Sequence, residues 1–124
     1  MKLSQYLSAV SILLSTTSAF ASPTLRCIYR EASGTTSDVS QDIQRDVEIS
    51  AKPDMSASVV NFKATNTDIS VSGATFANDN ANAVYIMISD SKTGSQSSSL
   101  GTKSTGLTYF RNGVNYQVSC FIVE

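Results

Sequence analysis

The chain has 124 residues, with 9 basic and 10 acidic side chains, two cysteines and no histidine. Its net charge of −1 comes from scattered charges, so no basic patch suited to nucleic acid stands out. Without histidine, nucleophile systems based on serine–histidine or cysteine–histidine pairs are excluded, and so are zinc sites with histidine ligands.

Residues 1–21 have the pattern of a secretory signal peptide. Lys2 is followed by a short, mostly apolar stretch, and the segment ends in Ala19-Phe20-Ala21, which is an Ala-x-Ala cleavage site. The apolar stretch is too short and too interrupted by serine and threonine for a stable membrane-spanning helix. We expect cleavage after Ala21, one domain over residues 22–124 and a secreted or periplasmic location, with an uncleaved membrane anchor as the alternative.

The two cysteines lie in the first and last predicted strands of this domain. Cys27 belongs to Leu25–Glu31 and Cys120 to Val114–Glu124, and each shares one alternating phase with apolar side chains. Two cysteines in an exported chain most often form one disulfide, so we predict a Cys27–Cys120 bond. Two free thiols or a metal pair are the alternatives, and two cysteines without histidine make a poor zinc site.

The segment after the first strand is ambiguous. Val39, Ile43 and Val47 are four residues apart, as on a helix, but they also share the odd-numbered phase of a strand. Asp38–Asp46 is therefore either one or two helical turns or a strand. In Arg45–Ala51, apolar and polar residues alternate, which predicts a strand with one solvent-facing side.

The middle of the chain predicts further strands separated by polar turns. Ala57–Ala64 and Ile69–Gly73 form a predicted hairpin, and Ala77–Asn82 a predicted polar loop. Ala83–Ser89 is apolar in both phases, which predicts a central strand with both faces covered, or with one face packed against a partner. Ser95–Thr105 is rich in serine, threonine and glycine, so it is either a weak edge strand or a mobile loop.

The chain ends in the clearest predicted hairpin. Asn112-Gly113 separates two strand-like runs, and this pair favours a type I′ turn, which needs a positive φ at both central residues. Tyr109 and Tyr116 fall on opposite strands of this hairpin, where their rings are expected to pack together.

These elements amount to seven or eight short strands, and no segment has a sustained helical period. The predicted fold is all-β: a small antiparallel β-sandwich, immunoglobulin-like or similar, whose first and last strands are joined by the disulfide. A barrel is the alternative, and the uneven expected strand lengths favour the sandwich. The tryptophan of true immunoglobulin domains is absent.

The acidic residues do not mark a catalytic site. Most of them fall at turns or strand ends, where aspartate bonds to nearby backbone, and no pair stands out as the two carboxylates of a glycosidase. Asn78-Asp79-Asn80 and Asp90 flank one strand and could offer oxygens to calcium at one end of a sandwich, although a polar turn explains them more simply. We predict no enzyme, no cofactor and no metal site.

The candidate binding residues are Arg26, Arg30, Arg111 and Asn112. The first two form an outward stripe on the first strand, and the others lie at the tip of the last hairpin. Arginine is enriched at binding surfaces, although such residues also serve solubility. We expect a non-enzymatic module that binds another macromolecule, a protein or a glycan; an inhibitor of a secreted hydrolase is one subclass. The alternatives are a structural subunit of a surface assembly and a carboxylate-dependent enzyme acting on polysaccharide.

Overall fold

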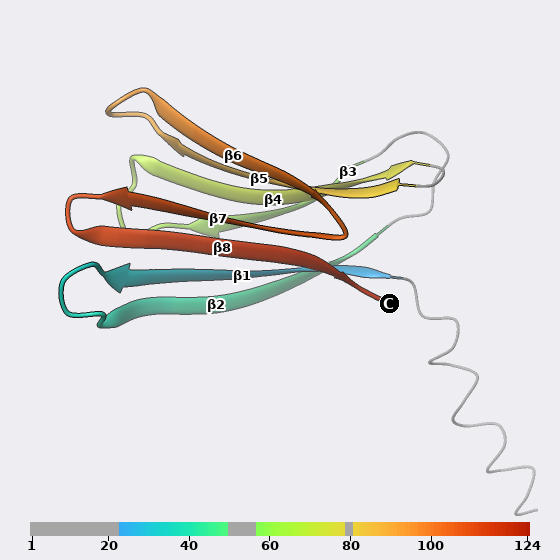
Figure 1. Ribbon diagram of the computed structural model, residues 1–124, viewed down its shortest axis with the longest axis horizontal. Helices are drawn as coiled ribbons and strands as arrows, with labels where there is room; N and C mark the ends of the chain where they lie inside the picture. Colours follow the sequence, from blue (N-terminus) through green and yellow to red (C-terminus); the bar gives the residue numbers. More distant parts are fainter. Residues whose placement is uncertain (1–22, 50–56, 79–80) are drawn as a thin grey trace, which may run out of the picture.

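The computed structural model describes residues 23–49, 57–78 and 81–124, so the predicted signal peptide lies outside it. Eight strands and no helix form within these ranges (Figure 1). The strands are Thr24–Ser33 (β1), Val39–Glu48 (β2), Ala57–Lys63 (β3), Ile69–Asn78 (β4), Ala81–Asp90 (β5), Ser95–Thr102 (β6), Ser104–Arg111 (β7) and Val114–Val123 (β8). The described ranges contain no helix that is long and apolar enough to span a membrane.

The strands form two four-stranded antiparallel sheets that pack face to face (Figure 1). Their orders are β2-β1-β8-β7 and β3-β4-β5-β6, so every hydrogen-bonded pair except β1–β8 joins strands that are consecutive in the chain. The predicted small antiparallel sandwich is confirmed. Its connectivity is a meander closed by the first and last strands, which differs from the Greek-key connections of immunoglobulin domains.

The core consists of the inward-facing residues of both sheets, because successive side chains of a strand point to opposite faces. Tyr29, Leu25 and Ile86 are among its largest fully buried side chains. The ring of Tyr29 in one sheet stacks on that of Phe62 in the other, with centroids 5.2 Å apart. The guanidinium of Arg45 lies 5.9 Å from the centroid of the Phe62 ring and covers the edge of the core.

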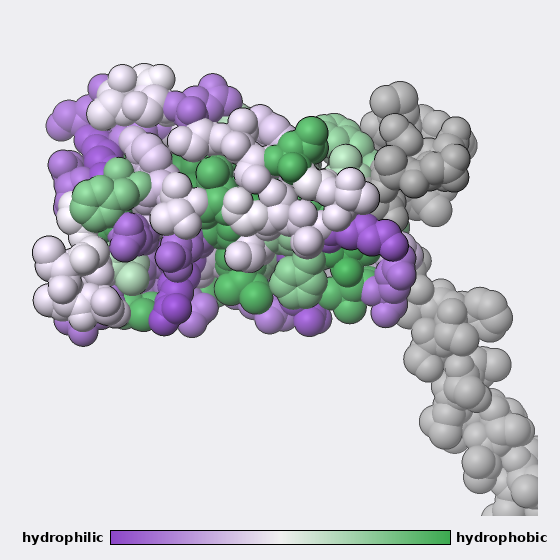
Figure 2. Space-filling model, in the orientation of Figure 1, coloured by the Kyte–Doolittle hydropathy of each residue, from purple (hydrophilic) through white to green (hydrophobic). Residues whose placement is uncertain are grey.

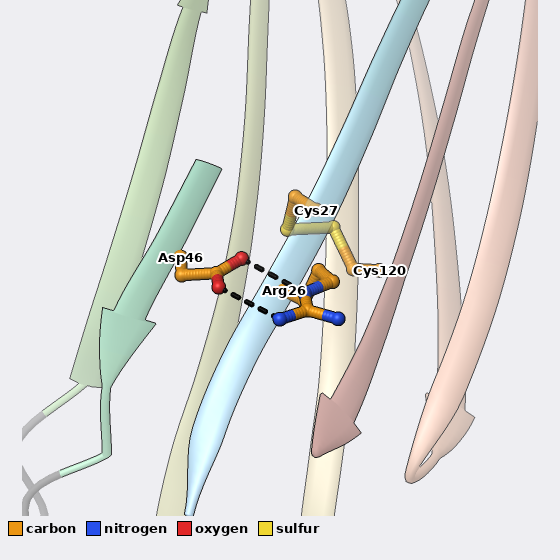
Figure 3. The surroundings of a disulfide bond; sticks show 4 residues. All are labelled: Arg26, Cys27, Asp46 and Cys120. Carbon is orange, nitrogen blue, oxygen red and sulfur yellow. Dashed lines mark hydrogen bonds and ion pairs between the residues drawn. A yellow bond between two sulfur atoms is a disulfide. The ribbon is translucent and has the colours of Figure 1, made fainter. Parts of the chain in front are cut away.

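The predicted disulfide is confirmed. Cys27 and Cys120 are directly opposite each other in the β1–β8 register and are bonded, and both side chains are buried (Figure 3). The bond therefore links neighbouring strands of one sheet, and it ties together the two strands that close the meander.

Two ambiguous segments are strands. Of the Asp38–Asp46 segment, all residues after Asp38 belong to β2, which continues as one strand to Glu48. The remainder of the expected Arg45–Ala51 strand includes residues outside the described ranges. The pairing explains the outcome, because β2 satisfies the free backbone edge of β1 along almost its whole length. Ser95–Thr105 contributes the edge strand β6, which pairs with β5, and then turns at Lys103 with a φ of 68°.

The predicted polar loop over Ala77–Asn82 is wrong in its bounds. β4 continues to Asn78, and Ala77 pairs with Asn82 in the ladder to β5. Asparagine and aspartate in this segment are typical of turns in a sequence, but antiparallel neighbours continue their ladder until the chain reverses. The last hairpin is as predicted: Asn112 and Gly113 have φ values of 49° and 77°.

Candidate functional site

Four hairpin turns gather at one end of the sandwich, at the left of Figure 1. They connect β1 to β2, β3 to β4, β5 to β6, and β7 to β8, and we call this region the four-turn end. The turns are bonded to one another in pairs: the Gly34 N–H donates to the Gly113 carbonyl at 2.7 Å, and the Ser91 N–H donates to the Asp68 carbonyl at 2.9 Å. Turns from both sheets are therefore held in fixed positions.

An open cavity of about 470 Å³ lies in the four-turn end. Hydrophilic and neutral side chains cover much of this end in Figure 2. The cavity is lined by residues of β1, the β1–β2 turn, the start of β2, the β3–β4 turn and the β7–β8 hairpin: Glu31, Ala32, Ser33, Thr36, Asp38, Ser40, Thr65, Asn66, Arg111, Asn112, Val114 and Tyr116.

Glu31 is a buried charged residue of this cavity, with 2% of its surface exposed. Its Oε2 atom accepts hydrogen bonds from the Thr65 N–H at 2.9 Å, from the Thr65 hydroxyl at 3.3 Å and from Gln41 Nε2 at 2.5 Å. These donors offset the cost of burying the carboxylate, and they fix it between the two sheets.

Tyr29 is the neighbour of Glu31 on the inward face of β1. Burial, together with the nearby carboxylate of Glu31, raises the pKa of the Tyr29 phenol far above its ordinary value. The hydroxyl has no partner with good hydrogen-bond geometry among the described residues. The phenol therefore stays protonated at any physiological pH.

Asp90 ends the inward face of β5 and is 1% exposed. Its carboxylate accepts from the N–H groups of Lys92 and Thr93 at 3.0 and 3.4 Å and from the Tyr109 hydroxyl at 3.1 Å, and it lies 2.7 Å from Arg111 Nη1. Burial alone would raise the pKa of Asp90, but these donors and the Arg111 charge outweigh it, so the pKa is lowered. The carboxylate is thus ionised and held in place.

Tyr116 is close enough to both Glu31 and Asp90 for their charges to raise the pKa of its phenol. It is 3% exposed, and its ring is tilted against that of Tyr109 with centroids 6.3 Å apart, which confirms the predicted cross-hairpin contact. Burial first, and then the charge of Glu31, raise the pKa of the Tyr116 phenol. Its hydroxyl forms no hydrogen bond with any described residue, although the side chain lines the cavity.

The structure separates the four predicted binding residues into two groups. Arg111 and Asn112 line the cavity, whereas Arg26 and Arg30 lie on the outer face of β1. Arg26 donates two hydrogen bonds of 3.0 Å to Asp46 (Figure 3), and this pairing holds the pKa of Asp46 below its usual value. The predicted arginine stripe therefore does not join the cavity.

The calcium arrangement considered from the sequence does not form. Asn78 pairs with Ala81 and Ile69 with Asp90, so Asn78 and Asp90 lie at opposite ends of β5, about 30 Å apart for a ten-residue strand. Asp79 and Asn80 lie outside the described residues. Within the described ranges, no three Asp, Glu, Cys or His side chains are grouped so as to hold a metal ion.

Sequence reasoning missed Glu31 and Tyr116 as cavity residues, and it did not anticipate the pairing of Asp90 with Arg111. A signal was present for the carboxylates: Glu31 continues the inward phase of Cys27 and Tyr29, and Asp90 continues that of the apolar residues of β5. A charged residue that continues a buried phase is a marker of a polar site at the end of a sandwich.

No protein-family model matches the chain, and neither a curated protein nor a solved structure matches it. We therefore infer a function from the four-turn end. Its chemistry is a set of donors and acceptors fixed by packing around an open cavity, which is the usual form of a binding site.

Proposed function

We propose that this protein is an exported, non-enzymatic binding module whose macromolecular partner docks at the four-turn end. The observation that carries the proposal is the open cavity of about 470 Å³. Polar side chains line it, and some of them belong to buried residues at the edge of the core. Glu31 and Tyr116 are almost completely buried there. Burying polar groups costs stability, so their convergence on a cavity favours a ligand site over simple packing.

Export is supported by two independent features. The sequence of residues 1–21 has the pattern of a signal peptide, and the core contains a disulfide, which is typical of secreted and periplasmic proteins. Both features favour a secreted or periplasmic location.

A binding role is favoured over catalysis by the state of the buried carboxylates. A general acid or base must exchange a proton with a substrate. Asp90 is engaged by three hydrogen-bond donors and an ion pair, and Glu31 by three donors, so both act mainly as structural acceptors. An inhibitor of a secreted hydrolase is one form of such a module, because the Asn112-Gly113 tip is a rigid loop beside the cavity.

The test is capture of partners from the medium and periplasm of the producing cells with three immobilised proteins. They are the wild type, Thr36→Trp, which places a large ring at the cavity, and Thr108→Trp, which places the same ring on the exposed outer face of β7. We expect the wild type and Thr108→Trp to retain the same partner and Thr36→Trp to lose it. Equal retention by all three proteins would reject docking at the four-turn end.

A second candidate function, a subunit of a surface assembly, is favoured by the outer face of the β3-β4-β5-β6 sheet. Val59, Phe76 and Leu100 are 48%, 41% and 68% exposed on this face. Val59 and Leu100 lie in the same row across the sheet, with Ala74 and Tyr85 between them. Self-association through this face would cover the row.

Sedimentation velocity over a range of concentrations tests this candidate. Assembly that disappears in Leu100→Ser, but persists in Phe110→Ser, would support it, since Phe110 is also exposed but lies on the other sheet. A wild-type protein that stays monomeric at every concentration would exclude it.

A further inference from the structure

We propose that the cavity at the four-turn end receives a cationic side chain of the partner, an alkylammonium or a guanidinium group. This inference rests on the proposed function and names the chemistry that the docking site recognises. It follows from the charges around the cavity, from the free hydrogen-bonding capacity of its floor, and from its apolar wall.

The charge around the cavity favours a cation. Glu31 and Asp38 both line it, and the cation that lines it, Arg111, has its Nη1 atom 2.7 Å from the buried carboxylate of Asp90. The positive charge of Arg111 is thus balanced by Asp90, which does not line the cavity. The two carboxylates that line the cavity have no cationic partner among the described residues. Lys92, in the β5–β6 turn at the same end, does not line the cavity.

The floor of the cavity has unused acceptors. The three hydrogen bonds of good geometry to Glu31 all go to Oε2, and the Tyr29 hydroxyl lies near the carboxylate without completing such a bond. The Tyr116 hydroxyl is likewise unpartnered on a side chain that is 3% exposed. Both side chains line the open cavity, so an ammonium or guanidinium group bound there could donate its N–H groups to these oxygens.

The walls suit the stem of such a side chain. Ala32 and Val114 line the cavity beside the polar groups, and the ring of Tyr116 adds an aromatic surface. Lysine and arginine side chains bury their methylene groups against apolar surface while the charged head reaches polar partners, and a cation is also attracted to an aromatic face. An anion in the same position would face two carboxylates.

NMR titration of the ¹⁵N-labelled protein tests the inference. The probes are N-acetyl N-methylamides of lysine, arginine, norleucine and glutamate, which differ only in the side chain. We expect saturable chemical-shift changes of the amides of residues 31–38, 65–66 and 111–116 with a cationic probe. Whichever of the lysine and arginine probes binds more tightly identifies the side chain that the cavity receives. Norleucine and glutamate should cause no saturable shift, and equal binding of the glutamate probe would overturn the proposal.

Variants of single acidic residues show where the cationic probe binds. Because hydrogen bonds to charged groups are the stronger ones, Glu31→Gln should raise the Kd of the cationic probe about tenfold or more. Asp38→Asn should raise it about threefold; Asp38 is exposed, so this variant will fold even if Glu31→Gln does not. The matched control Glu124→Gln removes the same charge at the opposite end of the sandwich and should bind as the wild type does (Figure 1).

The outcomes separate this inference from the function on which it rests. If partner capture depends on Thr36 but no cationic probe binds, the cation is wrong and the docking site stands. If the cationic probe binds the wild type, Asp38→Asn and Glu124→Gln equally, the charge argument fails. If the probe binds as expected while capture is insensitive to Thr36→Trp, the cavity is a cation site but not the docking surface.

Discussion

Gly73 and Cys120 face each other across the two sheets so closely that a Cβ atom on the glycine would overlap the cysteine Sγ. The same Cβ would lie 2.7 Å from the Sγ of Cys27. Gly73 lies on the inward face of β4, so the disulfide occupies the volume that a side chain at this position would fill. The bond therefore serves as core packing as well as a covalent link.

Gly73→Ala should lower the free energy of unfolding by about 1–3 kcal/mol, because an extra methyl in a filled core forces its neighbours to shift. Urea denaturation measures the change. Gly106→Ala is the matched control: it also adds a methyl within a strand, but the nearest atoms to its Cβ are 3.7 Å away, at ordinary contact distance. Equal stability of the two variants would show that the core at Gly73 adapts without cost.

Removing both cysteines should reduce the loss of stability that Gly73→Ala causes. In Cys27→Ala/Cys120→Ala the sulfur atoms are gone, so adding Gly73→Ala should cost less than it does in the wild type. A double-mutant cycle measures this coupling, and additive effects would mean that the sulfur atoms are not the source of the strain.

The disulfide itself should contribute much of the stability. The bonded residues are separated by 93 positions, and the chain-entropy model assigns about 4–5 kcal/mol to a loop of this length. Cys27→Ala/Cys120→Ala should therefore have a much lower urea midpoint than the wild type. Because both sulfur atoms are buried, the folded wild type should also resist reductant until urea unfolds it. Rapid reduction of the folded protein would contradict the observed burial.

Much of the fold could be predicted because strand signals are local. Alternating polarity identified β1, β3 and β8, the Asn112-Gly113 pair identified the final turn, and a chain with only two cysteines allowed one pairing. The extent of β2 and β4 was not predictable in this way. Their ends are set by pairing with neighbours far apart in the sequence, which overrides the local turn preference of asparagine and aspartate.

The candidate site was only partly predictable, for a similar reason. Arg111 and Asn112 were identified because they adjoin a recognisable turn, whereas the cavity depends on four turns that meet only in the folded sandwich. The outward phase of Arg26 and Arg30 was predicted, and it explains why Arg30 does not line the cavity although it adjoins Glu31 in β1. Arg26 also lies nearer the other end of β1. Side-chain alternation indicates a face of a sheet, and it does not indicate a position along the sandwich.

Asp90 should make stability depend on pH at the acidic end. Its pKa in the folded protein lies below the ordinary value of 3.8, so its contribution is fully present above about pH 3.8 and is lost as the pH falls through the folded pKa. We expect the urea midpoint of the wild type to fall below pH 4, and Asp90→Asn to reduce this dependence. Tyr109→Phe, which removes one donor to the carboxylate, should give an intermediate result.

Salt distinguishes this contribution from that of Asp46, whose pKa is also lowered, chiefly by its hydrogen bond with Arg26. The Arg26–Asp46 pair is about one-third exposed and should be screened in about 1 M salt, whereas the buried Asp90 should be screened less. An acid dependence that is the same in Asp90→Asn and in the wild type at high salt would refute the assignment.

Tyr29 should produce the opposite dependence at alkaline pH. Its pKa is raised in the folded protein, by burial first and then by Glu31, so the unfolded chain loses the proton near the ordinary value of 10.0 while the folded protein retains it. Stability should therefore decline as the pH rises above 10, and this decline should be smaller in Tyr29→Phe.

Absorbance at 295 nm measures the ionisation of Tyr29 directly. At about pH 11, the folded wild type and folded Tyr29→Phe should have equal tyrosinate absorbance, and after unfolding in guanidinium the wild type should have one tyrosinate more. A lower absorbance of the folded variant at that pH would mean that Tyr29 already ionises in the folded protein and that Glu31 and burial do not protect its proton.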